Sequence, residues 1–141
     1  MQNIRRHQGF TLIEILVVIT ILGILGALVI PKIMDRPNDA RVSATKQQIA
    51  DTVQALNLYK LDSGSYPSTA QGLVALVQKP STGKIPSNWR PYLDKQPKDA
   101  WGNELQYRAP GLHGSVDVFS LGADGTAGGE GYDADIGNWM D

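Results

Sequence analysis

The sequence predicts an α+β fold in which a long N-terminal helix, apolar in its first half and amphipathic in its second, packs on a small antiparallel sheet. Three observations support this prediction. Residues 10–30 form an almost uninterrupted apolar run, and residues 40–60 carry apolar side chains at helical spacing. Most of the 15 glycines and eight prolines come after residue 60, where short segments alternate with turns.

The apolar run is as long as a bilayer is thick. Between Phe10 and Ile30 only Thr11, Glu14 and Thr20 carry polar side chains, and 21 helical residues span roughly 30 Å. We therefore predict a transmembrane helix and not a buried core helix, because nothing else in the chain is able to cover so long a stretch. Basic residues flank the run on both sides, so charge alone does not set its orientation.

A short basic segment, residues 1–9, precedes the run and ends in glycine. One alternative is a secretory signal peptide, but the run is too long and a small-residue cleavage site at its far end is weak. Another is a twin-arginine signal, because Arg5 and Arg6 are adjacent. The third is a leader that is cut directly before the span, between Gly9 and Phe10, and the position of the glycine favours it.

An amphipathic helix is predicted over residues 40–60, after a break and restart at residues 37–39 and a kink or local melt near Pro31. A coiled-coil seam is the alternative, but the segment is too short for several heptads. We expect the apolar stripe to pack on the remainder of the chain, residues 63–141, which is called the head. The stripe consists of Val42, Thr45, Ile49, Thr52, Val53, Leu56 and Tyr59.

The head is predicted to open with a loop and a short helix. Ser68 and Gln71 have the spacing of a capping box, which predicts a helix that ends near Val77. Three prolines within residues 81–98 then predict an extended loop. Two aromatic side chains are expected to hold this loop to the core: Trp89 and Tyr92.

Two short strands, residues 104–109 and 116–121, are predicted next. The alternation along the second strand predicts a buried Val118 and a solvent-facing Asp117. His113, in the connecting loop, is expected to be exposed. Two strands alone are only marginally stable, so they are expected to lie on the long helix.

Charge is unevenly distributed, although the net charge is only −1. Residues 1–98 carry 12 basic and six acidic side chains, whereas residues 99–141 carry one basic and eight acidic ones. Nothing in this balance indicates a nucleic-acid partner. A loop with five glycines, residues 121–135, contains four of the acids: Asp124, Glu130, Asp133 and Asp135.

This acidic loop is expected either to be solvated or to bind a cation. The chain has no cysteine and the loop has no histidine nearby, so the ligands would be oxygens, which favours Ca²⁺. The EF-hand pattern is incomplete and is rejected.

The junction before the apolar run resembles the processing site of type IV pilins and type II secretion pseudopilins. It reads Gly9-Phe10-Thr11-Leu12-Ile13-Glu14. The resemblance implies cleavage after Gly9, N-methylation of Phe10, and an assembly role for Glu14 through a pair with the new amine of a neighbouring subunit. A pair between Glu14 and the amine of its own chain is the alternative. Such a pair offsets the cost of a carboxylate inside a bilayer, which is at least ~2.5 kcal/mol.

The C-terminal region narrows the resemblance to the major pseudopilins, the general secretion pathway protein G family, with a type IV pilin-like fold. The motifs are Ser120-Leu121-Gly122-Ala123-Asp124-Gly125 and Asp133-Ala134-Asp135-Ile136-Gly137-Asn138-Trp139. The resemblance implies one structural Ca²⁺ per subunit. Its implied ligands are the side chains of Asp124, Asp133 and Asp135 and a backbone carbonyl such as that of Leu121. Ala100 departs from the family, which often has proline before the tryptophan.

By this resemblance the protein is expected to be the major structural subunit of a type II secretion pseudopilus, a helical homopolymer that helps export folded proteins across the outer membrane. The implied partners are other copies, minor pseudopilins, the prepilin peptidase/methyltransferase and an inner-membrane platform protein. A type IV pilus subunit, which the lack of cysteine disfavours, and a minor pseudopilin are the alternatives. No catalytic motif is present, so an enzyme is not expected.

The expected division of the chain follows from these segments. Residues 1–9 form a cleaved leader, residues 10–30 the transmembrane stem, residues 31–62 the amphipathic second half of the long helix, and residues 63–141 the head. The resemblance implies one inner-membrane span, with the leader in the cytoplasm and the head in the periplasm.

Overall fold

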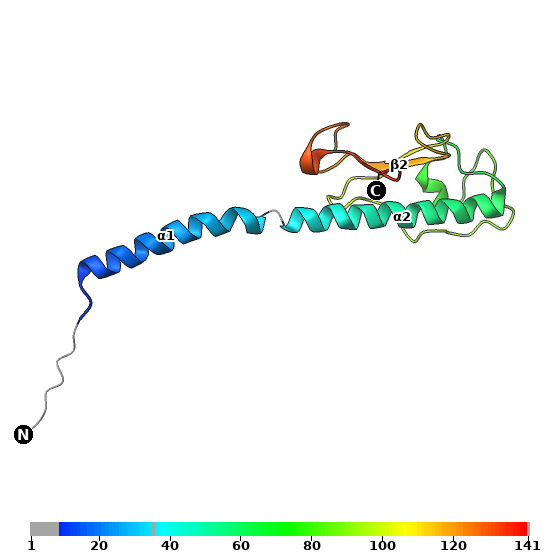
Figure 1. The fold of residues 1–141 in the computed structure, drawn as a ribbon. Helices are drawn as coiled ribbons and strands as arrows, with labels where there is room; N and C mark the ends of the chain where they lie inside the picture. Colours follow the sequence, from blue (N-terminus) through cyan, green and yellow to red (C-terminus); the bar gives the residue numbers. More distant parts are fainter. Residues whose placement is uncertain (1–8, 35, 141) are drawn as a thin grey trace, which may run out of the picture. The chain divides into compact units, whose positions relative to one another are not determined.

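The computed structural model describes residues 9–34 and 36–140, without the side chains of residues 28–36. It confirms the predicted α+β fold (Figure 1). The chain divides into two compact units between Pro37 and Asn38. In chain order the elements are α1 (Leu12–Met34), α2 (Arg36–Ser63), the 3₁₀ turn η1 (Leu73–Leu76), β1 (Gln106–Arg108), β2 (Asp117–Ser120), the 3₁₀ turn η2 (Gly131–Asp133) and β3 (Ile136–Gly137).

The apolar side chains of α1 are open to the surroundings. From Leu12 to Leu25 the large aliphatic side chains are between 49% and 84% exposed. Helical structure continues through Pro31 to Met34, so the local melt expected near Pro31 is not observed. Among the described residues, none of the helices has the length and apolar character needed to cross a membrane. Part of the predicted span, residues 28–30, lies among the side chains outside the description.

α2 supplies the predicted amphipathic helix. The members of its apolar stripe that are buried are Thr45, Ile49, Thr52, Leu56 and Tyr59, as predicted. The break predicted at residues 37–39 is wrong, because α2 already begins at Arg36. Pro37 lies in the first helical turn, where the missing N–H of proline sacrifices no intrahelical hydrogen bond.

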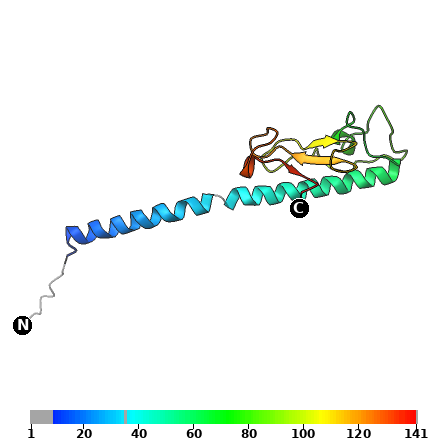
Figure 2. The same cartoon turned by 45° about the horizontal axis from the view of Figure 1, so that its top comes forward.

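The core lies between α2 and the sheet, which face each other in both views (Figures 1 and 2). The loop over residues 81–98 is held to this core as predicted. Trp89 Nε1 donates to the carbonyl of Ala75 at 3.0 Å, and the rings of Tyr92 and Tyr59 pack at a centroid distance of 5.4 Å. The main apolar members of the core are Ile49, Leu56, Tyr59, Leu73, Leu76, Leu105, Val116, Val118 and Ile136.

The helix predicted to end near Val77 is only partly confirmed. Its capping box exists: the amide of Gln71 donates to Ser68 Oγ at 3.2 Å, and the amide of Ser68 donates to Gln71 Oε1 at 2.8 Å. Gly72 then takes a φ of +61°. A left-handed residue does not continue a right-handed helix, so only the short turn η1 follows.

β2 is the central strand of a three-stranded antiparallel sheet in the order β1-β2-β3. Tyr107 pairs with Val118 across β1 and β2, and Ser120 pairs with Ile136 across β2 and β3. The two predicted strands are confirmed but are shorter than predicted. β3 is not predicted by the sequence, because two residues are too few to show an alternating pattern.

Candidate functional site

The predicted cleavage junction lies in accessible, non-helical chain. Gly9 and Phe10 precede α1, and Phe10 is 81% exposed. A Cβ built on Gly9 meets no atom within 4 Å. Packing among the residues that the structure describes therefore does not require glycine at position 9. Residues 1–8 of the predicted leader lie outside the described residues.

Thr11 and Glu14 form a capping box at the start of α1. The amide of Thr11 donates to Glu14 Oε2 at 3.4 Å, and the amide of Glu14 donates to Thr11 Oγ1 at 3.3 Å. The sequence analysis misses this motif, although a threonine followed three residues later by glutamate is its signal. In the uncut chain, the Glu14 carboxylate thus bonds to an amide at the start of its own helix. Both predicted pairings of Glu14 involve an amine that exists only after cleavage.

The acidic loop, residues 121–135, is closed on itself and attached to α2. The amide of Ala123 donates to the carbonyl of Tyr132 at 2.9 Å, and Tyr132 Oη donates to Asp39 Oδ1 at 3.0 Å. Its five glycines all have positive φ, a conformation that other residues adopt only with strain. The loop therefore follows a path that its glycines make possible.

The three predicted acidic ligands have different surroundings in this loop. Asp124 is exposed, and its carboxylate accepts the hydroxyl of Thr126 at 2.7 Å and the Thr126 amide at 3.0 Å. These hydrogen bonds hold the pKa of Asp124 below its usual range. Asp135 Oδ1 accepts the amide of Gly128 at 3.1 Å, whereas the side chain of Asp133 is exposed.

The donor chemistry of the loop suits Ca²⁺, because carboxylates and backbone carbonyls are the hard oxygen ligands that this ion prefers. Its geometry is not that of an assembled site. Among the described residues, no group of three or more His, Asp or Glu side chains is close enough to hold a metal ion. The structure thus does not bring Asp124, Asp133 and Asp135 together, and Leu121 lies half-buried at the start of the loop.

A second polar cluster, formed by His113, Asp117 and Trp139, is missed by the sequence analysis. The prediction of a solvent-facing Asp117 is wrong: the residue is 3% exposed, because the β1–β2 connection folds over it. Its carboxylate accepts the amide of Leu112 at 2.7 Å, and Nδ1 of His113 lies 3.1 Å away. Burial alone raises the pKa of Asp117, but the hydrogen bonds from Leu112 and His113 outweigh it and lower the pKa.

His113 is exposed as predicted, but it also has a structural contact. Its ring stacks on the indole of Trp139 with a centroid distance of 3.9 Å and an interplanar angle of 10°. The cluster therefore ties the C-terminal residues to the β1–β2 connection. No local sequence pattern predicts this cluster, because the stacked residues His113 and Trp139 lie far apart in the chain.

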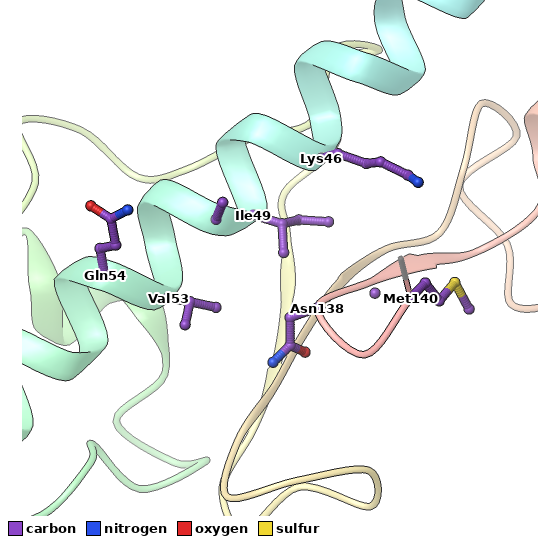
Figure 3. A pocket seen from close by; sticks show the side chains of 8 residues that line it. Lys46, Ile49, Val53, Gln54, Asn138 and Met140 are labelled. Atoms are coloured by element: carbon purple, nitrogen blue, oxygen red, sulfur yellow. The ribbon is translucent and has the colours of Figure 1, made fainter.

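A surface hollow lies between α2 and the C-terminal residues (Figure 3). Among the described residues that line it, none carries a carboxylate, an imidazole or a hydroxyl group. Its lining consists of Lys46, Ile49, Ala50, Val53, Gln54, Gly137, Asn138 and Met140.

Comparison with known proteins first defines the class. Residues 4–30 match the prokaryotic N-terminal methylation motif, which includes the junction at Gly9. The chain is thus of the class whose N-terminus carries this motif, and it combines the motif with a small α+β head.

The remainder of the chain identifies the family. Residues 32–139 match the family of type II secretion system (T2SS) protein G. Type II secretion system core protein G of Pseudomonas aeruginosa is 56% identical over 137 residues, which cover 96% of each chain. The Vibrio cholerae protein of the same name is 49% identical over 141 residues, covering 99% of this chain and 96% of the relative.

The fold agrees with these sequence matches. The crystal structure of the major pseudopilin from the type 2 secretion system of enterohaemorrhagic Escherichia coli has a TM-score of 0.66 and 37% identity. The match covers 75% of this chain and 92% of the solved one. The chain therefore belongs to the type II secretion system protein G family, a family of structural pseudopilin subunits, and the family indicated by the sequence motifs is confirmed.

Proposed function

We propose that this protein is the major structural subunit of a pseudopilus, and that it polymerises after processing to help export folded proteins across the outer membrane. The family match over residues 32–139 carries this proposal. The exposed aliphatic side chains of α1 supply the physical reason for assembly. Such a surface requires lipid or the helices of other copies around it.

Processing is proposed to occur at the bond between Gly9 and Phe10, followed by N-methylation of Phe10. The match to the methylation motif and the exposure of Phe10 support this assignment. Glu14 is proposed to pair with the Phe10 amine of a neighbouring copy during assembly. Its contact with the Thr11 amide is long, at 3.4 Å, and a charged amine is a stronger partner for a carboxylate than a neutral amide.

Before assembly, the chain is proposed to be a single-pass inner-membrane protein with its head in the periplasm. Its proposed partners are further copies, minor pseudopilins, the prepilin peptidase/methyltransferase and the platform protein of the secretion machine. We propose no enzymatic activity and no nucleic-acid partner, in keeping with a family of structural subunits.

Mass spectrometry of the protein from cells that express the secretion system tests the processing step. We expect a mature chain that begins with N-methylated Phe10. A Glu14→Gln chain is expected to be processed in the same way but to form no fibres in electron micrographs. A mature N-terminus near Ala27 would exclude the proposed processing, and normal fibres from Glu14→Gln would exclude the assembly role of Glu14.

We also propose that residues 121–135 hold one structural Ca²⁺. The carboxylates of Asp124, Asp133 and Asp135 and the carbonyl of Leu121 would be its ligands. The proposal is supported by a donor set made only of oxygens and by the repulsion between carboxylates in one short loop. When bound, the ion supplies positive charge that cancels this repulsion, while the glycine-rich backbone of the loop presents the oxygens.

Calcium removal tests this second proposal. Calcium at a hundredfold excess over its Kd stabilises the folded head by about 2.7 kcal/mol if it binds only the folded state. We therefore expect EDTA to lower the melting temperature of the purified protein, and Asp133→Asn to abolish most of that difference. Asp94→Asn is the control, because Asp94 is exposed and lies outside the loop. This variant is expected to show the same EDTA-dependent drop in melting temperature as the wild type. A melting temperature that does not respond to EDTA or added calcium contradicts the proposal.

A further inference from the structure

Asp99 is a buried carboxylate in the turn before β1, and it is 6% exposed. Its Oδ1 accepts the amides of Trp101 and Asn103, at 3.0 and 2.8 Å. Its Oδ2 accepts the hydroxyl of Ser120 at 2.7 Å. Each oxygen therefore has a donor, as a buried carboxylate requires.

Ser120 and Asn103 connect Asp99 to the start of the acidic loop. Ser120 Oγ is fully buried and accepts the amide of Gly122 at 3.1 Å while it donates to Asp99. Asn103 Nδ2 lies 3.4 Å from the carbonyl of Gly122 and 3.4 Å from Asp99 Oδ2. Both backbone polar groups of Gly122 are thus held by partners of Asp99.

Gly122 joins the two ends of the acidic loop. Its φ is +72°, and a side chain at this position would collide with the backbone of Asp133. The chain on either side of Gly122 contains Leu121 and Asp124. The next residue, Ala123, donates its amide to the carbonyl of Tyr132 at 2.9 Å, so the first part of the loop, which Gly122 anchors, is bonded to the last part.

The turn that carries Asp99 is itself attached to α2. The amide of Ala100 donates to Oγ1 of Thr45 at 3.1 Å, and Thr45 is fully buried. The turn is closed by the amide of Asp99, which donates to the carbonyl of Asn103 at 2.8 Å. The turn is thus hydrogen-bonded to α2 through Ala100 and to the acidic loop through the neighbouring Asp99 and Ser120.

We propose that Asp99 is the positioning residue of the acidic loop: through Ser120 and Asn103 it holds Gly122, and with it residues 121–135, to the core, and so anchors the oxygen donors of the loop for their convergence on an ion. Asp99 is not a ligand, because its own oxygens are occupied by donors of the protein. The attachment of the loop to the core through Asp99 is inferred from the hydrogen bonds alone. The effect of Asp99 on calcium binding rests on the proposed calcium function.

Hydrogen exchange of the detergent-solubilised full-length protein, in the presence of EDTA, tests the loop directly. Ser120→Ala removes the shorter of the two links between Asp99 and Gly122, keeps the one through Asn103 and is the milder variant, whereas Asp99→Asn replaces the carboxylate itself. In both variants we expect the amides of residues 121–135 to exchange about tenfold faster. This factor corresponds to the free energy lost when a buried polar group loses its hydrogen-bond partner. If Asp99→Asn does not fold, Ser120→Ala decides the test.

Two matched controls separate a local effect from general destabilisation. Asp117→Asn alters an aspartate that is as well buried, at 3% exposure, but bonds to Leu112 and His113. Ser63→Ala alters a buried serine that bonds to the carbonyls of Tyr59 and Ser65. Both controls are expected to leave exchange in the loop within about twofold of the wild type. Unchanged exchange in Ser120→Ala, or equal acceleration in the controls, overturns the positioning role.

Calorimetric titration of the same variants with Ca²⁺ tests the effect of Asp99 on calcium binding. If the wild type binds the ion, Ser120→Ala and Asp99→Asn are expected to weaken its affinity about tenfold, and the two controls are expected to retain it. Wild-type affinity in Ser120→Ala overturns the claim that the link anchors the oxygen donors for calcium binding. A wild-type protein that binds no Ca²⁺ overturns the calcium function, while the exchange experiment still decides the role of Asp99 in the loop.

Discussion

α1 and the head use apolar side chains in opposite ways. On α1 the aliphatic side chains from Leu12 to Leu25 are about half exposed or more, whereas Leu56 and Tyr59 of α2 are completely buried. Apolar surface in contact with water costs about 25 cal/mol per Å². The buried apolar residues of α2 and the head therefore stabilise the fold of the single chain, whereas those of α1 remain available for contacts outside it.

The glycines of the two regions differ in the same way. A Cβ built on Gly23 or Gly26 in α1 meets no atom within 4 Å, whereas one built on Gly111 or Gly137 of the head would collide with neighbouring side chains. The head thus needs glycine at these two positions for its own packing. Small residues in α1 are suited instead to the close approach of other helices.

The largest expected difference between the regions comes from removing a leucine. Leu56→Ala leaves a cavity in the core and is expected to lower the free energy of unfolding of the head by about 2–5 kcal/mol. Leu22→Ala, at a side chain that is 61% exposed, is expected to change it by less than about 0.5 kcal/mol. Urea unfolding in detergent, followed by tryptophan fluorescence, measures both. Equal effects would show that α1 is part of the cooperative fold of the head.

A glycine substitution sharpens the comparison within the acidic loop. Gly122→Ala combines an unfavourable left-handed φ with a collision against Asp133 and is expected to destabilise the head by about 2–4 kcal/mol. Gly102→Ala is the control, because its φ is +95° but a Cβ there meets nothing within 4 Å. The control is expected to cost only about 1–2 kcal/mol. A Gly102→Ala variant as unstable as Gly122→Ala would remove the steric part of the explanation.

Acid is expected to weaken the head through Asp117. Because the pKa of this carboxyl is lower in the folded protein than in the unfolded chain, its contribution to stability is complete above pH ~4 and is lost as the pH falls through the lowered folded value. Melting temperatures between pH 2 and pH 6 are expected to fall less steeply on the acidic side in Asp117→Asn. Parallel curves for the two proteins would contradict this role of Asp117.

The smallest expected effect on stability is at Gly26. Gly26→Ala places a better helix former in α1 and is expected to stabilise the isolated helix by about 0.5–1 kcal/mol. The same change is expected to impair fibre formation, because the added methyl group separates packed helices. Circular dichroism and electron microscopy of the same preparation test the two halves of this prediction. Normal fibres would show that the glycine is not at a helix contact.

Local patterns predicted the parts of the fold that depend on local spacing. The buried stripe of α2 follows from side chains three and four residues apart, because these lie on one face of any α-helix. The capping box of Ser68 and Gln71 was predictable for the same reason, although Gly72 then prevented the helix. The N-terminal motif that contains Gly9 was also recognised from contiguous residues, and the family assignment to which it contributed is confirmed.

The sequence by itself thus determined the two long helices, the buried face of α2 and the class of protein, because each depends on residues that are close together in the chain. Only the tertiary structure decided the pairing of β3 with β2, the burial of Asp117 and the link from Asp99 through Ser120 to Gly122. Some of these contacts join residues far apart, such as Asp99 and Ser120, whereas the burial of Asp117 depends on how the nearby β1–β2 connection folds over it. Their contacts depend on the path of the whole chain through space, and no local period or composition encodes that path.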